Sequence, residues 1–348
     1  MLYQVVESNK NAFNAGSKAT ADIISIAEKM SFKPLYVHHI EAKNNIFSKI
    51  VNQIRYFFEW SKLYKKVADN SVILLQHPFR NRQCNREKTI LKLKQRKNVK
   101  VISLIHDIEE LRNPVYNEHS HFEFEFMMRV ADQFIVHNSK MKEWLKDKGV
   151  GESKIVILEI FDYLSDSPIN EKNFANNIII AGNLDLSKSA YLGEIQNVSN
   201  LNFDLYGVNY KNNASPNIAY HGAFKPEELS EQFTSGFGLV WDGTNIDTCD
   251  GNTGNYLRYN NPHKLSLYIS SGVLVVIWKE AALATFVKEK GIGLCVNSIT
   301  ECSELISNMS KDQYDEICSR VNEESIKLRS GFYSKRALEE ALRRIQNI

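Results

Sequence analysis

The segment Asn260-Asn261-Pro262-His263-Lys264 places a lysine at the beginning of a predicted helix that extends to Gly272. Asn261 is a good N-cap, Pro262 fits the first helical position, and Gly272 can adopt the left-handed conformation that ends a helix. A helix N-terminus gathers unpaired N–H groups and the positive end of the helix dipole, so it attracts phosphate. Lys264 adds a positive charge for the same anion. The alternative is an ordinary crossover helix whose lysine faces water.

Polar residue pairs follow three predicted strands in the first half of the chain, at 72–75, 101–105 and 133–136. The pairs are Gln76 and His77, His106 and Asp107, and His137 and Asn138. Ligands of open parallel sheets bind beyond the carboxyl ends of the strands, so these pairs favour a binding site. The alternative is simple loop polarity, since every strand must exit into water.

The second half has its own polar strand ends and a long glycine-containing loop. Strand-end residues are Gly182 and Asn183, with Lys188 just beyond them, Tyr206, and Asp242. The segment from Asp242 to Tyr259 is predicted to be an unstructured polar loop that contains Cys249, and loops of this length are usually functional. Together with the lysine helix, these residues are expected to hold a nucleotide diphosphate. No GxGxxG, Walker lysine or Asp-x-Asp motif is present, which predicts metal-independent charge neutralisation by lysines and the helix dipole.

Strand and helix patterns alternate along the 348 residues and predict two parallel α/β sheets. Residues 161–177 have linker composition and separate two halves of similar size. We predict an N-terminal domain at 1–165 and a C-terminal domain at 170–332. The last helix, at 333–348, is predicted to cross back to the first domain.

The composition argues against several classes of protein. The formal net charge of +2 gives no global field for nucleic acid, and no segment approaches the roughly 20 apolar residues that span a bilayer. The N-terminus does not have the pattern of a signal peptide. Five scattered cysteines without a CxxC pair indicate reduced thiols and no metal site. These features predict a cytoplasmic protein.

A block around the lysine motif carries a resemblance to known enzymes. It contains Gly238-Leu239-Val240-Trp241-Asp242-Gly243, Thr248-Cys249, Gly254-Asn255-Tyr256-Leu257, and Tyr259-Asn260-Asn261-Pro262-His263-Lys264. Shorter supporting segments are Asn14-Ala15-Gly16-Ser17-Lys18-Ala19, Leu104-Ile105-His106-Asp107-Ile108-Glu109-Glu110-Leu111-Arg112 and Ala181-Gly182-Asn183-Leu184. Over nearly its whole length the chain resembles a group of bacterial glycosyltransferases. This group includes the β-1,6-galactofuranosyltransferases of O-antigen assembly and the accessory glucosyltransferases of serine-rich adhesins.

The resemblance implies an α/β GT-B fold, in which two Rossmann-like domains face a cleft. The C-terminal domain would hold a UDP-sugar, with Lys188 and Lys264 at the diphosphate. The donor residues implied are Gly16, Gly182, Asn183, Lys188, Tyr206, Asp242, Tyr256, Asn260, Asn261, His263 and Lys264. With the acceptor in the N-terminal domain, the strand-end residues His77, His106 and His137, together with Arg112, are predicted to lie on the acceptor side. Ser17 and Thr20 depart from the family pattern, in which a bulkier residue and an arginine are common, and this weakens the assignment of the first loop.

An inverting transfer needs a base that accepts the proton of the attacking sugar hydroxyl. Asp107 is our candidate because it ends a strand on the acceptor side, and Glu110 is the second candidate. The alternative role for Asp107 is a helix cap or an ion pair with Arg112.

Residues 80–100 contain nine Lys or Arg residues and one acid, Glu87. The helix predicted at 46–67 adds further cations beside the aromatic residues Phe57, Phe58, Trp60 and Tyr64. The alternatives are a solvated helix face with core aromatics, or docking of the 80–100 segment to the inner face of an anionic membrane. Such docking would suit a lipid-linked acceptor.

We therefore predict a glycosyltransferase that moves a hexose, with galactofuranose favoured, from a UDP-sugar to a cell-surface polysaccharide or O-antigen glycan. One alternative is an accessory glucosyl- or N-acetylglucosaminyltransferase for a serine-rich adhesin. The second is a non-catalytic protein that binds sugar nucleotides. No cofactor and no nucleic acid are expected, and a homo-oligomer stays open.

Overall fold

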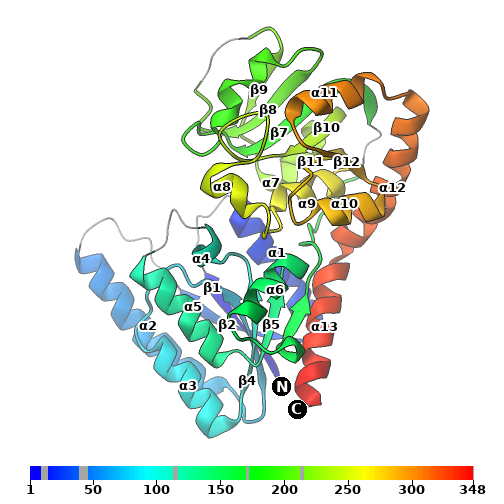
Figure 1. The fold of residues 1–348 in the computed structure, drawn as a ribbon. Coiled ribbons are helices and arrows are strands. Elements are labelled where there is room, and N and C mark those ends of the chain that lie inside the picture. The colour runs from blue at the N-terminus through cyan, green and yellow to red at the C-terminus, as the bar shows by residue number, and fades with distance from the viewer. Residues whose placement is uncertain (9–14, 39–45, 113–116, 170–171, 212–214, 348) are drawn as a thin grey trace.

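The computed structural model describes residues 1–8, 15–38, 46–112, 117–169, 172–211 and 215–347, which form two lobes (Figure 1). Each lobe is built on a six-stranded parallel sheet, with order β2-β1-β3-β4-β5-β6 in the first and β12-β11-β10-β7-β8-β9 in the second. The first sheet contains β1 (Leu2–Ser8), β2 (Lys33–His38), β3 (Val72–His77), β4 (Lys100–Ile105), β5 (Gln133–Val136) and β6 (Ile155–Ile157). The second contains β7 (Asn173–Asn183), β8 (Asn202–Val208), β9 (Ile218–Gly222), β10 (Ser235–Val240), β11 (Leu274–Trp278) and β12 (Gly293–Val296). The predicted pair of Rossmann-like sheets is confirmed.

Helices cover both sheets. The first lobe carries α1 (Ala15–Lys29), α2 (Ile46–Lys66), α3 (Arg86–Lys97), α4 (Glu109–Arg112), α5 (Glu118–Val130) and α6 (Ser139–Asp147). The following helices are α7 (Pro226–Leu229), α8 (Gly251–Tyr256), α9 (His263–Ser270), α10 (Ala284–Lys290), α11 (Ile299–Ser307), α12 (Lys311–Ser330) and α13 (Phe332–Gln346). None of the helices in the described part of the chain is long and apolar enough to cross a membrane.

Continuous apolar runs explain the sheets, because parallel strands between two helix layers are buried on both faces. All five residues of β11 are at most 1% exposed. Gly238 on β10 lies so close to α9 that an added Cβ would be 2.2 Å from the Tyr268 ring. This close approach fixes α9 against the sheet, and with it the lysine at its beginning.

The C-terminal helix α13 packs on the first lobe, against α1, β5 and β6 (Figure 1). Arg344 donates hydrogen bonds to the Ser153 and Ile155 carbonyls at 3.2 and 2.9 Å. At the other end, the Asp162 carboxylate accepts from the Tyr333 and Ser334 N–H groups. The segment predicted as a linker, 161–177, is therefore partly buried at its beginning, and β7 starts within it at Asn173.

Candidate active site

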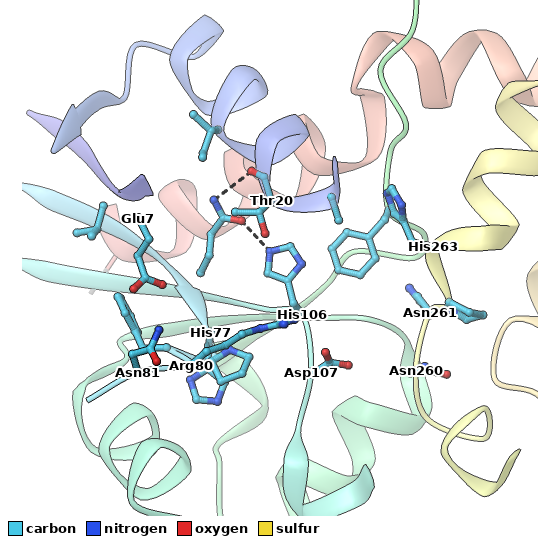
Figure 2. Close-up of a pocket in the computed structure, with 18 residues that line it drawn as sticks. Glu7, Thr20, His77, Arg80, Asn81, His106, Asp107, Asn260, Asn261 and His263 are labelled. Carbon is cyan, nitrogen blue, oxygen red and sulfur yellow. Dashed lines mark hydrogen bonds between the residues drawn. The ribbon is translucent and has the colours of Figure 1, made fainter. Parts of the chain in front are cut away.

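A cavity of about 320 Å³ lies at the carboxyl ends of β1, β3 and β4, and the segment before α9 forms its opposite wall (Figure 2). Its lining consists of Val5, Glu7, Ala19, Thr20, Ile24, Gln76, His77, Pro78, Phe79, Arg80, Asn81, His106, Asp107, Phe161, Asn260, Asn261, Pro262 and His263. Parallel strands end at one edge of a sheet, so the polar residues after β3 and β4 meet here. Both lobes thus contribute to one site.

The His106 imidazole lies in the cavity and is held by a chain of hydrogen bonds (Figure 2). Gln76 Nε2 donates to the Thr20 carbonyl at 3.4 Å, so Gln76 Oε1 accepts from His106 Nε2 at 2.7 Å. The ring also stacks on Phe161, with centroids 5.2 Å apart. Burial lowers the pKa of His106 to about 3 and that of His77 to about 3. Both imidazoles are therefore neutral near pH 7 and suit hydrogen bonding to hydroxyl groups.

Asp107 lies at the meeting point of the lobes. Its Oδ1 accepts from the Tyr256 hydroxyl at 3.2 Å, and the Ile108 N–H donates to the same hydroxyl at 3.1 Å. Arg112 Nη1 is 3.5 Å from Oδ2. Burial raises the pKa of Asp107, and the charges of Arg112 and Arg80 oppose that rise. A carboxylate with a raised pKa, at the edge of a cavity, has the properties of a general base.

Glu110 is not brought to this cavity. It lies on α4 with its side chain 15% exposed, and its Oε1 is 4.0 Å from His121 Nδ1. Burial raises the pKa of Glu110 to about 7. Arg112, on the same short helix, instead points its guanidinium toward Asp107 and Glu109.

Two lysines of the second lobe, Lys188 and Lys264, lie close to Asp242. Lys264 Nζ donates to the Trp241 carbonyl at 3.0 Å and to Asp242 Oδ1 at 3.2 Å. Lys188 is exposed and interacts electrostatically with Asp242, Lys264, Arg112 and Asp107. Lysines near a helix N-terminus can hold an anionic diphosphate.

Three other residues assigned to the donor, Gly182, Asn183 and Tyr206, do not line the cavity. Gly182 and Asn183 end β7, and Asn183 Oδ1 accepts from the Asp185 N–H and from Asn209 Nδ2. Tyr206, 6% exposed, stacks on His221 with centroids 4.6 Å apart, and neither ring lines the cavity. Gly16 lies in the first turn of α1.

Asn261 and His137 form a joint between the lobes. Asn261 Nδ2 donates to the His137 and Glu159 carbonyls at 2.9 and 3.0 Å, and its Oδ1 accepts from Asn138 at 2.8 Å. The Asn261 N–H donates to His137 Nδ1 at 2.9 Å, so His137 Nε2 carries the proton and donates to the Ile105 carbonyl. His137 is 1% exposed, and with both nitrogens bonded within the protein it presents no group to an acceptor.

The prediction that Asn261 caps the lysine helix is wrong. Helix α9 begins at His263 after Pro262, and no side chain caps it. The Asn261 amide is used between the lobes instead. The His263 ring packs against Tyr163 in a tilted arrangement, with centroids 5.1 Å apart, and it lines the cavity beside Asn260. These two residues assigned to the donor therefore line the same cavity as the residues assigned to the acceptor.

The predicted unstructured loop after Asp242 contains the short helix α8, and Cys249 is buried at 1% exposure rather than solvated. Thr244 donates its N–H and hydroxyl to Asp250, which fixes the turn before the helix. Gly254 packs so closely that a Cβ would be 2.6 Å from the Cys249 carbonyl carbon. The turn thereby positions Tyr256 to reach Asp107.

Sequence reasoning missed cavity residues just after β3 and at the end of β1. Arg80 and Asn81 follow the polar pair that ends β3, and Glu7 is the penultimate residue of β1. Burial raises the pKa of Glu7 to about 7, and Gln83 donates a hydrogen bond to it. Arg80, Asn81 and Glu7 could have been predicted as site residues because each lies at or just beyond the carboxyl end of a predicted parallel strand.

Comparison with known proteins agrees with this geometry. Residues 3–160 match the N-terminal domain, and residues 178–341 the C-terminal domain, of glucosyltransferase 3-like proteins. The β-1,6-galactofuranosyltransferase WbbI of Escherichia coli K12 is 31% identical over 98% of each chain. Glucosyltransferase 3 of Streptococcus gordonii is 25% identical over 95% of this chain and 97% of its own length.

Solved structures show the same fold at low identity. Anabaena Alr3699/HepE in complex with UDP-glucose superposes with a TM-score of 0.59 at 10% identity, over 100% of this chain and 99% of its own. An α-glucosyltransferase in complex with UDP gives 0.60 at 16% identity, over 99% and 100%. The fold and the two-lobed site therefore define a GT-B glycosyltransferase.

Within that class, the chain belongs to the glucosyltransferase 3-like family, since the two domain matches together cover most of its length. The family predicted from the sequence is confirmed, as is the prediction that the protein is a glycosyltransferase.

Proposed function

We propose that this enzyme transfers a hexosyl group from a UDP-sugar held by the second lobe to a glycan hydroxyl held in the cavity of the first. The observation that carries the proposal is the position of Asp107. It lines the cavity and also interacts electrostatically with Lys188 of the opposite lobe. An acceptor hydroxyl in the cavity and a diphosphate at the lysines would meet beside this carboxylate.

The proposed chemistry is a single displacement. The acceptor oxygen forms a bond to the anomeric carbon while the bond from that carbon to the UDP oxygen breaks. The hydroxyl proton passes to Asp107, and Lys188, Lys264 and Arg112 balance the charge that develops on the leaving diphosphate. In this proposal the cations take the part that a metal ion plays in other transferases, so turnover should persist in EDTA.

Galactofuranose is the donor sugar we favour, and an O-antigen or other surface polysaccharide the acceptor. The relative of 31% identity carries the name of a galactofuranosyltransferase, and the glucosyltransferase 3 relative is 25% identical. That second relative supports the alternative of a glucosyl- or N-acetylglucosaminyltransferase that acts on an adhesin glycan.

A panel of UDP-sugars tests the donor. Thermal melts with UDP-galactofuranose, UDP-galactopyranose, UDP-glucose and UDP-N-acetylglucosamine should show the largest stabilisation for the true donor, because a ligand stabilises by mass action. UDP release is then measured with that donor and an oligosaccharide acceptor. Binding without UDP release from any acceptor would favour the non-catalytic alternative.

The acceptor is proposed to be lipid-linked, and membrane contact through the basic segment at 80–100 stays a prediction, with Arg80, Arg82, Lys88 and Arg96 exposed and three other cations engaged within the lobe. Arg86 is fully buried beside Glu123, and Lys94 pairs with Asp132. Lys97 donates to the Val67 carbonyl. Several cations of this segment thus hold the first lobe together. Homo-oligomer formation stays a prediction.

A further inference from the structure

Helix α2 exposes an apolar stripe. The stripe, here called the apolar face of α2, consists of Phe47, Ile50, Val51, Ile54, Phe57 and Phe58. Its members recur every three or four residues, so they lie along one side of the helix. Phe47 is 72% exposed and Phe58 is 65% exposed. Single exposed apolar residues are ordinary, but a contiguous stripe of this size marks a contact surface.

The opposite side of α2 already fills its place in the core. Tyr56, Trp60 and Leu63 are at most 3% exposed and pack against the sheet. A helix that covers a sheet needs only one apolar side. Within the described part of the first lobe, the second apolar side is therefore not needed to cover the sheet, and it is available to a partner outside the lobe.

The charges that flank the stripe indicate the partner. Five cations of α2 are exposed: Lys49, Arg55, Lys62, Lys65 and Lys66. The one acid of the helix, Glu59, already bonds the His38 ring and N–H. Two such faces from two copies would bring like charges together, whereas anionic headgroups would attract each cation. Apolar side chains bordered by lysines and arginines are typical of helices that lie in a membrane interface.

The apolar face of α2 adjoins the acceptor cavity through the β3–α3 loop. A groove of about 520 Å³ on this face is lined by Lys49, Ile50, Gln53, Ile54, Phe57, Phe58 and Cys84. Gln53 donates to the Arg82 carbonyl at 2.8 Å and accepts from the Cys84 N–H at 2.9 Å. Residues 78–81 of the same loop line the cavity. A membrane at α2 would therefore lie beside the acceptor site.

We propose that α2 seats the enzyme on an anionic phospholipid surface, with its apolar face inserted between headgroups and its cations at their phosphates. Docking there would present a lipid-linked glycan to the cavity. This consequence rests on the proposed function, whereas membrane binding itself does not.

Vesicle sedimentation at low salt tests the proposal. The wild type should sediment with vesicles that contain phosphatidylglycerol and stay in solution with pure phosphatidylcholine. The double variant Ile54→Gln, Phe58→Gln should lose about tenfold or more in partitioning, because it removes apolar area that the interface would bury. The matched control is Ile326→Gln, which changes a side chain of α12 that is 66% exposed and should sediment like the wild type.

Three results would overturn the proposal: a wild type that stays in solution with anionic vesicles, one that binds both vesicle types equally, or a double variant that sediments normally. If size-exclusion chromatography shows an oligomer that only the double variant dissociates, without vesicle binding, the face is an interface between copies instead. Transfer to a water-soluble acceptor should be unchanged in the double variant. If the wild type itself transfers no sugar to any acceptor, the proposed function is contradicted, whereas the result with vesicles still stands.

Discussion

The two sides of the candidate site handle charge in opposite ways. On the first lobe, burial keeps His77 and His106 neutral and raises the pKa of Asp107. On the second lobe, Lys188 interacts electrostatically with Asp107, and Lys264 is paired with Asp242. The first side suits a neutral, hydroxyl-rich acceptor, and the second suits an anionic donor. The contrast supports the proposed placement of the two substrates without reference to any relative.

The largest effect is expected where the two sides meet. Asp107→Asn should lower the turnover of UDP-sugar by about 10²- to 10⁴-fold, the usual contribution of a general base. UDP affinity by calorimetry should stay close to that of the wild type, since the change is on the acceptor side. Glu110→Gln is the matched variant and should keep most activity. A large loss in Glu110→Gln with normal Asp107→Asn turnover would transfer the role to Glu110.

Removal of a cation from the second lobe should weaken binding of the UDP donor. Lys264→Met should weaken UDP binding by about 10- to 100-fold, because a charge-assisted hydrogen bond contributes roughly 1.5–3 kcal/mol. Lys279→Met, an exposed lysine of the same lobe, serves as control and should bind UDP normally. Equal affinities for the two variants in calorimetry would remove Lys264 from the diphosphate assignment.

The joint that holds the sides together should contribute to stability. Asn261→Ala removes three side-chain hydrogen bonds and leaves buried partners unsatisfied, at a cost of about 1–3 kcal/mol. The Tm should therefore fall by roughly 2–10 °C. Asn260→Ala is the matched control, because the buried Asn260 Oδ1 finds no hydrogen-bond partner among the described residues. A similar fall in Tm for both variants would contradict the prediction that the Asn261 hydrogen bonds between the lobes stabilise the protein.

The smallest effect concerns pH. Burial lowers the pKa of His137 and that of His263 to about 4, below the ordinary value of 6.5. The unfolded chain then binds more protons between pH 6.5 and 4, so the stability that these neutral rings provide above pH 6.5 is lost as the pH falls through that window. Buried acids such as Asp162, whose pKa burial raises to about 6, act in the opposite direction.

The test is therefore a difference in slope. Thermal melts from pH 7 to pH 4.5 should show a smaller fall in Tm for His263→Gln than for the wild type, relative to each protein at pH 7. Parallel curves would mean that protonation of His263 does not contribute to acid sensitivity.

Local sequence patterns predicted the elements, but they could not predict contacts between distant residues. The polar ends of β3 and β4 converge as predicted, because parallel strands share an edge. Arg86 was assigned to an exposed basic face, yet it is buried against Glu123, which comes 37 residues later. Asn261 meets His137 across 124 residues, and no local pattern encodes that pairing.

The Tyr256 hydroxyl has a further consequence because it belongs to one lobe and holds the carboxylate of the other. A hydrogen bond of this kind is largely lost when the distance between donor and acceptor increases by about 1 Å. A parted pair of lobes would leave Asp107 without the bond that favours its ionised form. In the proposed mechanism, Asp107 would therefore be ready to accept a proton only while the donor lobe is closed onto the first lobe.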